Sequence, residues 1–171
     1  MWRKVVLVGC LVFLVLASQA VGGPYSIAPV VQAASTTIVI SQFQVAGATA
    51  TDEFVELHNV GNLPVDLNGY RVAYRSATGV TDVSLYSWAT STIIPAGGYY
   101  LLGQTGYVGA TPANVTYSAS SIAAAGGGLA LRNGAANTGT IIDSVGYGTA
   151  TNAFIETTVV AAPATNASRA R

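Results

Sequence analysis

Cysteine is almost absent from this chain of 171 residues, since the single Cys10 lies in an apolar stretch at the N-terminus. The rest of the chain therefore offers no disulfide, no zinc–thiolate site and no cysteine nucleophile. A domain of the remaining length still buries enough surface to fold without such cross-links.

Charge is also scarce. Charged residues make up 8% of the chain, against roughly 25% in an average soluble protein. Beyond the N-terminal stretch there is no lysine, and five scattered arginines face seven acidic residues, which leaves a net charge of −2. Nucleic acids bind proteins through clustered basic groups that release counterions from phosphates. We therefore expect no nucleic-acid partner.

Long apolar runs are missing except at the N-terminus. Residues 1–4 form a short basic segment and residues 5–17 are apolar. In the Ser18-Gln19-Ala20 segment, Ser18 and Ala20 then place small side chains at the −3 and −1 positions of a cleavage site. This pattern predicts a helical signal peptide over residues 1–20 and a secreted or cell-surface location. The run is short for a membrane span of about 20 residues. Cleavage near Ala33 or Ala34, or retention as an anchor, are the alternatives.

The remainder is rich in short β-branched and aromatic segments separated by turn residues. We expect a linker over residues 21–36, a β-sandwich over 37–160 and a C-terminal tail over 161–171. No helical periodicity of useful length is present outside the signal, so the predicted fold is all-β. Expected strands cover residues 38–43, 53–59, 70–75, 83–88, 93–94, 99–103, 129–132 and 140–145, with an edge strand at 154–155.

Alternation within two of these strands predicts which side chains face the core. In 53–59, Val55 and Leu57 point inward, whereas Phe54, Glu56 and His58 lie on the other face. Strand 70–75 is expected to bury Tyr70, Val72 and Tyr74 and to keep Arg71 and Arg75 in water. Residues 104–121 are expected to form a long loop, and the glycines 126–128 a flexible turn.

Three blocks of sequence together resemble the lamin tail domain, an immunoglobulin-like β-sandwich, in its bacterial exported form. They are FVELHNVG with VDLNGY at 54–61 and 65–70, IPAGGYYLL at 94–102, and GLAL with IDSVGYG at 128–131 and 142–148. Tyr70 departs from the family, in which a tryptophan is common at this place. The resemblance implies an exported or surface module without a catalytic role of its own.

Candidate chemistry concentrates around residues 52–58. Asp52, Glu53 and Glu56 form an acidic cluster with Asp66 close in sequence, and His58 is the only histidine. A weak calcium site on these acids, or a metal site on Glu56 and His58, is conceivable, but the spacing matches no known metal loop. A glycosidase pair of Glu56 and Asp143 is a further alternative. Solvated strand and turn acids explain the pattern more simply.

Aromatic side chains offer another alternative, a platform for a glycan or a peptide. Its candidates are Tyr86, Trp88, Tyr99, Tyr100, Tyr107 and Tyr117. Core and rim positions are their commoner role in a sandwich.

The sequence thus predicts a non-catalytic, exported β-sandwich module for interaction with a protein or glycan at the cell surface. We expect no catalytic residue, no cofactor and no metal, and membrane contact only through an uncleaved signal. An exported hydrolase that uses acids near Asp52–Glu56, and a structural or adhesion subunit of the cell surface, are the alternatives.

Overall fold

A computed structural model describes residues 35–119 and 121–171. The expected signal peptide and most of the expected linker lie outside these residues. The described part contains strands and turns, with no helix in it. It likewise contains no helix with the length and hydropathy needed to cross a bilayer.

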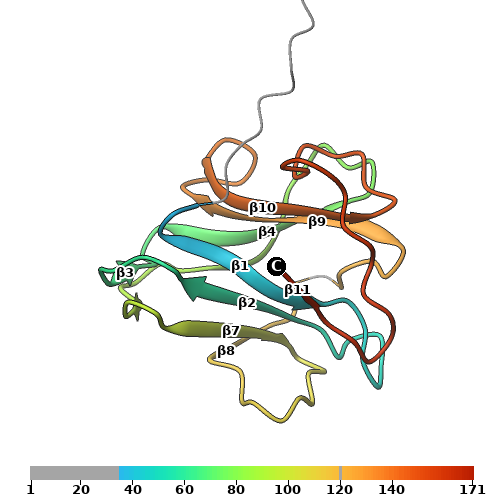
Figure 1. Ribbon diagram of the computed structural model, residues 1–171, viewed down its shortest axis with the longest axis horizontal. Helices are drawn as coiled ribbons and strands as arrows, with labels where there is room; N and C mark the ends of the chain where they lie inside the picture. The colour runs from blue at the N-terminus through green and yellow to red at the C-terminus, as the bar shows by residue number, and fades with distance from the viewer. Residues whose placement is uncertain (1–34, 120) are drawn as a thin grey trace, which may run out of the picture. The chain divides into compact units, whose positions relative to one another are not determined.

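A five-stranded sheet forms one layer, in the order β11-β1-β2-β7-β8. Its strands are β1 (Ile38–Gln44), β2 (Phe54–Asn59), β7 (Tyr99–Gln104), β8 (Val115–Tyr117) and β11 (Arg169–Ala170). Neighbours are antiparallel except for β7 and β8, which run parallel. In Figure 1, β11 lies beside β1 at the edge of this sheet.

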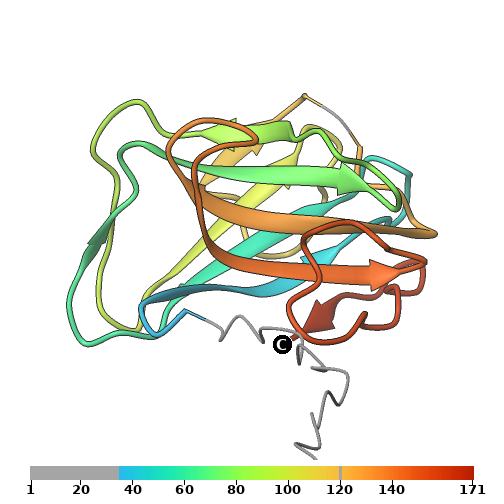
Figure 2. The same ribbon diagram turned by 90° about the horizontal axis from the view of Figure 1, so that it is seen from above.

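A four-stranded sheet, in the order β10-β9-β4-β5, forms the other layer. Its strands are β4 (Tyr70–Ser76), β5 (Val83–Ser87), β9 (Gly126–Asn133) and β10 (Thr140–Gly148). A small ribbon of β3 (Val65–Asp66) and β6 (Ile93–Ile94) is separate from both sheets. Figure 2 shows the two sheets stacked face to face. The predicted all-β sandwich is therefore confirmed.

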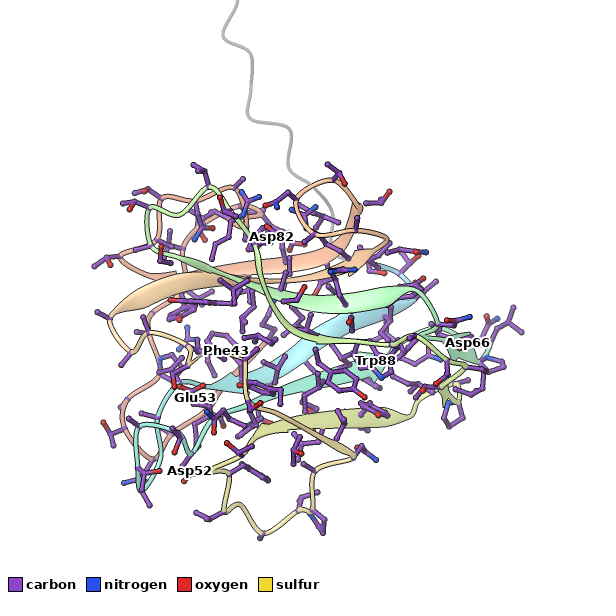
Figure 3. The ribbon with its side chains drawn as sticks, turned by 180° about the vertical axis from the view of Figure 1, so that it is seen from behind. Phe43, Asp52, Glu53, Asp66, Asp82 and Trp88 are labelled. Carbon is purple, nitrogen blue, oxygen red and sulfur yellow. The ribbon has the colours of Figure 1, made fainter. Side chains whose placement is uncertain are left out.

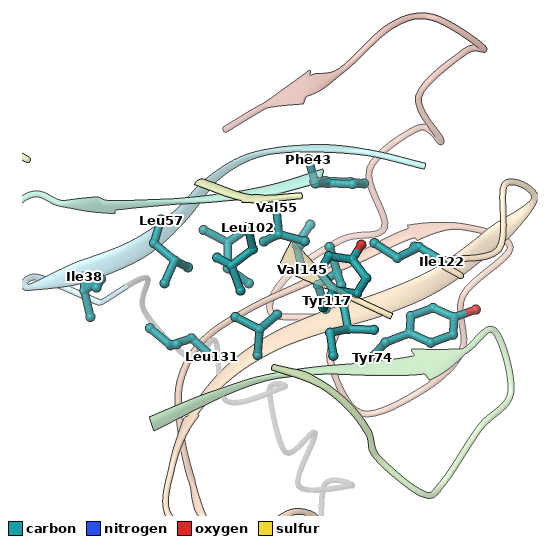
Figure 4. Close-up of a cluster of buried hydrophobic side chains, with 14 of the residues drawn as sticks. Ile38, Phe43, Val55, Leu57, Tyr74, Leu102, Tyr117, Ile122, Leu131 and Val145 are labelled. Carbon is teal, nitrogen blue, oxygen red and sulfur yellow. The ribbon is translucent and has the colours of Figure 1, made fainter. Parts of the chain in front are cut away.

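The hydrophobic core fills the space between the two sheets (Figure 4). Val55 and Leu57 of β2 are fully buried, as their alternation predicts. They share one core with Leu131 of β9 and Val145 of β10. Aliphatic and aromatic side chains from both layers thus exclude water, which is the main source of stability in such a sandwich.

Two segments expected to be irregular are strands. Residues 115–117 lie within the expected loop and form β8, and the glycines 126–128 begin β9 and are buried. A Cβ atom at Gly127 would lie 2.6 Å from the Tyr74 ring and 2.8 Å from the carbonyl oxygen of Arg75. The glycine run is therefore needed for close packing inside a strand, and the prediction of a flexible turn is wrong.

The outward face of β4 is covered, not solvated. Ala73 is fully buried and Arg75 is nearly so, because Phe154 packs over them. Residues 154–155 form no edge strand; they belong to an irregular segment that crosses the four-stranded sheet. The expectation that Arg75 lies in water is therefore wrong.

The tail region takes part in the domain. β11 pairs with Gln42 and Phe43 of β1, and Val160 forms a parallel bridge with Tyr147 of β10. The side chain of Pro163 is buried. The tail is therefore extended and ordered by backbone pairing at the edges of both sheets.

Candidate interaction face

Glu53 is a structural carboxylate in the interior of the sandwich. Its side chain is 0% exposed, and both of its oxygens lie 3.0 Å from the backbone N–H of Ile122, which donates to them. The hydroxyl of Tyr117 donates to Oε2 at 3.4 Å. Burial raises the pKa of Glu53 to about 7, and these hydrogen bonds oppose the rise only in part. The expectation that it is a solvated acid is wrong.

Asp52 organises the loop before β2. Its Oδ2 accepts a hydrogen bond from the N–H of Ala48, and its Oδ1 accepts one from the N–H of Val108. The side chain is buried, with both oxygens occupied by backbone donors. Asp66, at the exposed end of β3, likewise accepts backbone N–H groups, those of Asn68 and Thr92. These hydrogen bonds lower the pKa of Asp66.

A buried ion triplet lies on the outward face of the four-stranded sheet. Asp82 pairs with Nε of Arg75 at 2.7 Å and with Nε of Arg132 at 2.6 Å. Both guanidinium groups also lie over the ring of Phe154, at 4.7 and 5.3 Å from its centroid. Burial alone would raise the pKa of Asp82, but the N–H of Asn137 and the two arginines lower it. The triplet is therefore a buried structural element.

The side chain of Asp143, on β10, connects the two sheets at one side of the sandwich. Its Oδ2 accepts the N–H of Ile40 and pairs with Arg171, each at 2.7 Å. Arg171 also pairs with Glu156. Burial raises the pKa of Asp143 to about 6. A pocket of about 130 Å³ adjoins this group, between residues 144–146 of β10, the segment 156–160 and Arg171.

The acids predicted as a metal or catalytic site do not converge, whereas Asp143 and Glu156 share Arg171 as an ion-pair partner. Figure 3 shows Asp52, Asp66 and Asp82 in separate parts of the molecule. Glu56 projects from the opposite side of β2 to the core, where its Oε1 accepts the hydroxyl of Ser41, and Asp143 faces β1 from the other sheet. Within residues 35–119 and 121–171, no three acidic or histidine side chains gather as a metal site requires. The Glu56–Asp143 pair and the site on Asp52, Glu53 and Glu56 are not assembled.

The side chain of His58 stacks on an aromatic ring. It faces Tyr99 across the β2–β7 ladder, and the two rings stack with centroids 4.1 Å apart and planes inclined by only 7°. Tyr99 is 59% exposed. Its exposure follows from the register, because β8 begins opposite Leu102 and does not extend along β7 as far as Tyr99. The stacked pair therefore stands at the surface of the five-stranded sheet.

A second aromatic pair lies farther along the same surface. Phe54 meets the ring of Tyr107 edge to face, with centroids 5.7 Å apart. Tyr107 reaches this position from the loop after β7 because Gly103 has no side chain, and a Cβ there would lie 3.0 Å from the tyrosine ring. We call the surface formed by Phe54, Glu56, His58, Tyr99 and Tyr107 the outer face.

The other aromatic candidates belong to the interior. Trp88 and Tyr117 are buried, and Tyr86 and Tyr100 are half-buried against the core. Tyr86 and Tyr100 both contact Trp88 edge to face, at 5.2 and 5.7 Å between centroids. Only Tyr99 and Tyr107 of the six candidates are thus placed on the outer face. That His58 joins them is not predictable from local sequence, because its partner strand lies about 40 residues away.

The two packed sheets define an immunoglobulin-like β-sandwich domain. More specifically, the chain belongs to the lamin tail domain family, whose model matches residues 31–149. The resemblance of the sequence to this family is thereby confirmed. A comparison with curated proteins gave no match.

Proposed function

We propose that this chain is an exported, non-catalytic interaction module that binds a partner at the cell surface through its outer face. The observation that carries the proposal is the His58–Tyr99 stack, which presents a large aromatic side chain to solvent on the surface of the five-stranded sheet. Exposed aromatic groups are enriched where proteins bind partners. Membership of the lamin tail domain family is consistent with a binding role.

The position of the acids favours this proposal over an exported hydrolase. Hydrolysis of a glycosidic bond needs two carboxyl groups that face one reacting centre. Here both oxygens of Glu53 and Oδ2 of Asp143 accept backbone N–H groups inside the sandwich. Asp143 and Glu156 are both paired with Arg171, and Glu56 lies on the outer face. Raised pKa values at Glu53 and Asp143 therefore reflect burial in a structural role.

Short sheet edges favour a binding module over an adhesive subunit that associates through open strands. The five-stranded sheet ends in β11 and β8, of two and three residues. At β10, Val160 pairs with Gly146 and Gly148, and Glu156 accepts the N–H of Ser144. The remaining edge is β5, of five residues, and its pairing with β4 contains a register shift. Edges that are short, covered or irregular are poor templates for strand addition.

Export and binding can be tested together in the producing organism. The full chain is expressed with a C-terminal tag, and its N-terminus is sequenced from culture fluid and from washed cells. We expect protein that begins after Ala20, and binding of the added protein to washed cells. Tyr99→Ala should abolish most of this binding, whereas Val80→Ala, at an 81% exposed position in another loop, should not. Cytoplasmic retention, or equal binding by the Tyr99 variant, would overturn the proposal.

A further inference from the structure

The outer face carries almost no charge. Glu56 is the only carboxylate in β1, β2, β7 and β8, and these strands contain neither arginine nor lysine. Arg169 of β11 is paired in register with Phe43, which points to the core side, and so it does not project onto this face. A strongly anionic partner would find no cationic group here, and complementarity of charge favours an uncharged one.

The two aromatic pairs are separated along the strand direction. Phe54 and His58 lie four residues apart on β2 and on the same face, which corresponds to roughly 13 Å at the usual strand rise. This length exceeds a single sugar ring and suits a short run of linked sugars or an extended chain. The aromatic pairs stand at its two ends, so a linear ligand can touch both.

Polar side chains of β1 and β2 flank the line between the aromatic pairs, and the apolar Leu101 of β7 lies opposite Glu56 on the other side. Gln42 lies directly opposite Glu56 in the β1–β2 ladder, and Gln44 lies opposite Phe54. Gln42 and Gln44 each donate an Nε2 hydrogen bond, to Ser168 and to the carbonyl of Asp52, which holds both amides in place. The carboxylate of Glu56 is held in turn by Ser41. Amide and carboxylate oxygens accept hydrogen bonds from hydroxyl groups.

The geometry points to an uncharged, linear polysaccharide as the ligand of the outer face, bound along β2 from the His58–Tyr99 stack to the Phe54–Tyr107 pair. Sugar rings have an apolar C–H face that packs on aromatic rings and a rim of hydroxyls that hydrogen-bond to fixed acceptors. Tyr99 takes the apolar face of one sugar, and Glu56 and Gln42 accept hydroxyls of the next. This inference rests on the proposed binding role of the same face.

Calorimetry with the full chain tests the inference directly. The probes are soluble oligosaccharides of β-linked glucose, xylose, mannose and N-acetylglucosamine, with a polyuronic acid as the anionic comparison. We expect binding of at least one neutral oligosaccharide, with little change in affinity between low and high NaCl. Tyr99→Ala should weaken it about tenfold, the loss of one aromatic contact. Tyr99→Phe should bind like the parent, because the ring is kept.

Treatment of washed cells separates this inference from the proposed function. If a glycan is the partner, periodate oxidation of the cells removes binding and protease digestion does not. The reverse result, or no binding to any neutral oligosaccharide, would overturn the glycan inference. The proposed function would still stand in that case if binding to cells depended on Tyr99. Glycan binding that Tyr99→Ala leaves intact would show that the ligand lies elsewhere and would also overturn the inference.

Discussion

The backbone N–H of Ile40 donates a hydrogen bond of 2.7 Å to Oδ2 of Asp143, and so links the two sheets along one side. Both residues adjoin irregularities in their strands, since the β1–β2 register shifts after Ile40 and the β9–β10 register shifts before Asp143. Bulges of this kind turn side chains and backbone groups out of the regular ladder. Arg171 pairs with the same oxygen and completes the link.

Removal of this carboxylate should cost considerable stability. Asp143→Ala leaves the N–H of Ile40 without its acceptor and Arg171 without one partner, so we expect a loss of about 3 kcal/mol in the free energy of unfolding. Urea denaturation at neutral pH measures it. Asp143→Asn keeps an oxygen for Ile40 and should lose clearly less; equal losses would show that the hydrogen bond to Ile40 contributes little.

Glu53 should make the fold more stable in mild acid than at alkaline pH. Its pKa is about 7 in the folded protein and 4.5 without the fold. The folded state therefore holds a proton that the unfolded state has released, and stability from this group falls as the pH rises from about 4.5 through 7. Glu53→Gln carries no charge and keeps an oxygen for Ile122. We expect its free energy of unfolding to exceed that of the parent by about 3 kcal/mol at pH 8 and to come close to it near pH 4.5.

A pH series of urea denaturations, run on parent and Glu53→Gln in parallel, gives this difference. Asp143 acts in the same direction, because its pKa is also raised, to about 6. It is present in both proteins, so the difference between their curves isolates Glu53. If the free energies of unfolding of the two proteins changed in parallel over the whole pH series, the assignment of a raised pKa to Glu53 would be contradicted.

Substitution of Asp82 should reduce the stability of the fold more than substitution of most other acidic residues. Asp82→Ala leaves Arg75 and Arg132 buried without their shared partner, and removal of one member of a buried ion pair costs about 3–5 kcal/mol. Thermal unfolding followed by circular dichroism detects such a loss. Val80→Ala, in the same loop, is the control and should change stability by less than about 0.5 kcal/mol. A mild effect at Asp82 would mean that water reaches the arginines.

Gly127 should tolerate no side chain. An alanine Cβ would lie within 3 Å of Tyr74, the Arg75 carbonyl oxygen and the Tyr147 hydroxyl, and overpacking of this kind costs about 1–3 kcal/mol. Gly97→Ala is the comparison, because nothing lies within 4 Å and the only penalty is its φ of +71°, worth about 1 kcal/mol. We expect a lower denaturant midpoint for Gly127→Ala than for Gly97→Ala. The opposite order would argue against tight packing at Gly127.

Local alternation was enough to predict much of the fold. Val55 and Leu57 were placed correctly because a strand buries every second residue, whatever its neighbours are. The glycines at 126–128 misled the prediction, because glycine marks turns more often than crowded strands. β8 was missed because a strand of three residues leaves hardly any periodic signal.

The chemistry of the acids depends on distant partners and was less predictable. From the sequence, Glu53 is expected to be a surface acid. In the structure it accepts a hydrogen bond from the N–H of Ile122, which lies 69 residues away. Arg75 is likewise expected to be solvated, whereas in the structure the ring of Phe154 covers it. The aromatic side chains Tyr99 and Tyr107 were recognised as candidates, yet their pairing with His58 and Phe54 required the strand register and the loop after β7.

The antiparallel pairing of β1 with β11 has a mechanical consequence. Arg171 follows the pair Gln42–Ala170 and donates its N–H to the carbonyl of Ser41, so both strands leave the pairing in the same direction. A pulling force applied between Thr37 and Arg171 would therefore open these hydrogen bonds one after another, and would not load them together in shear. Under tension this edge of the domain should peel at low force, while the rest of the sandwich stays folded.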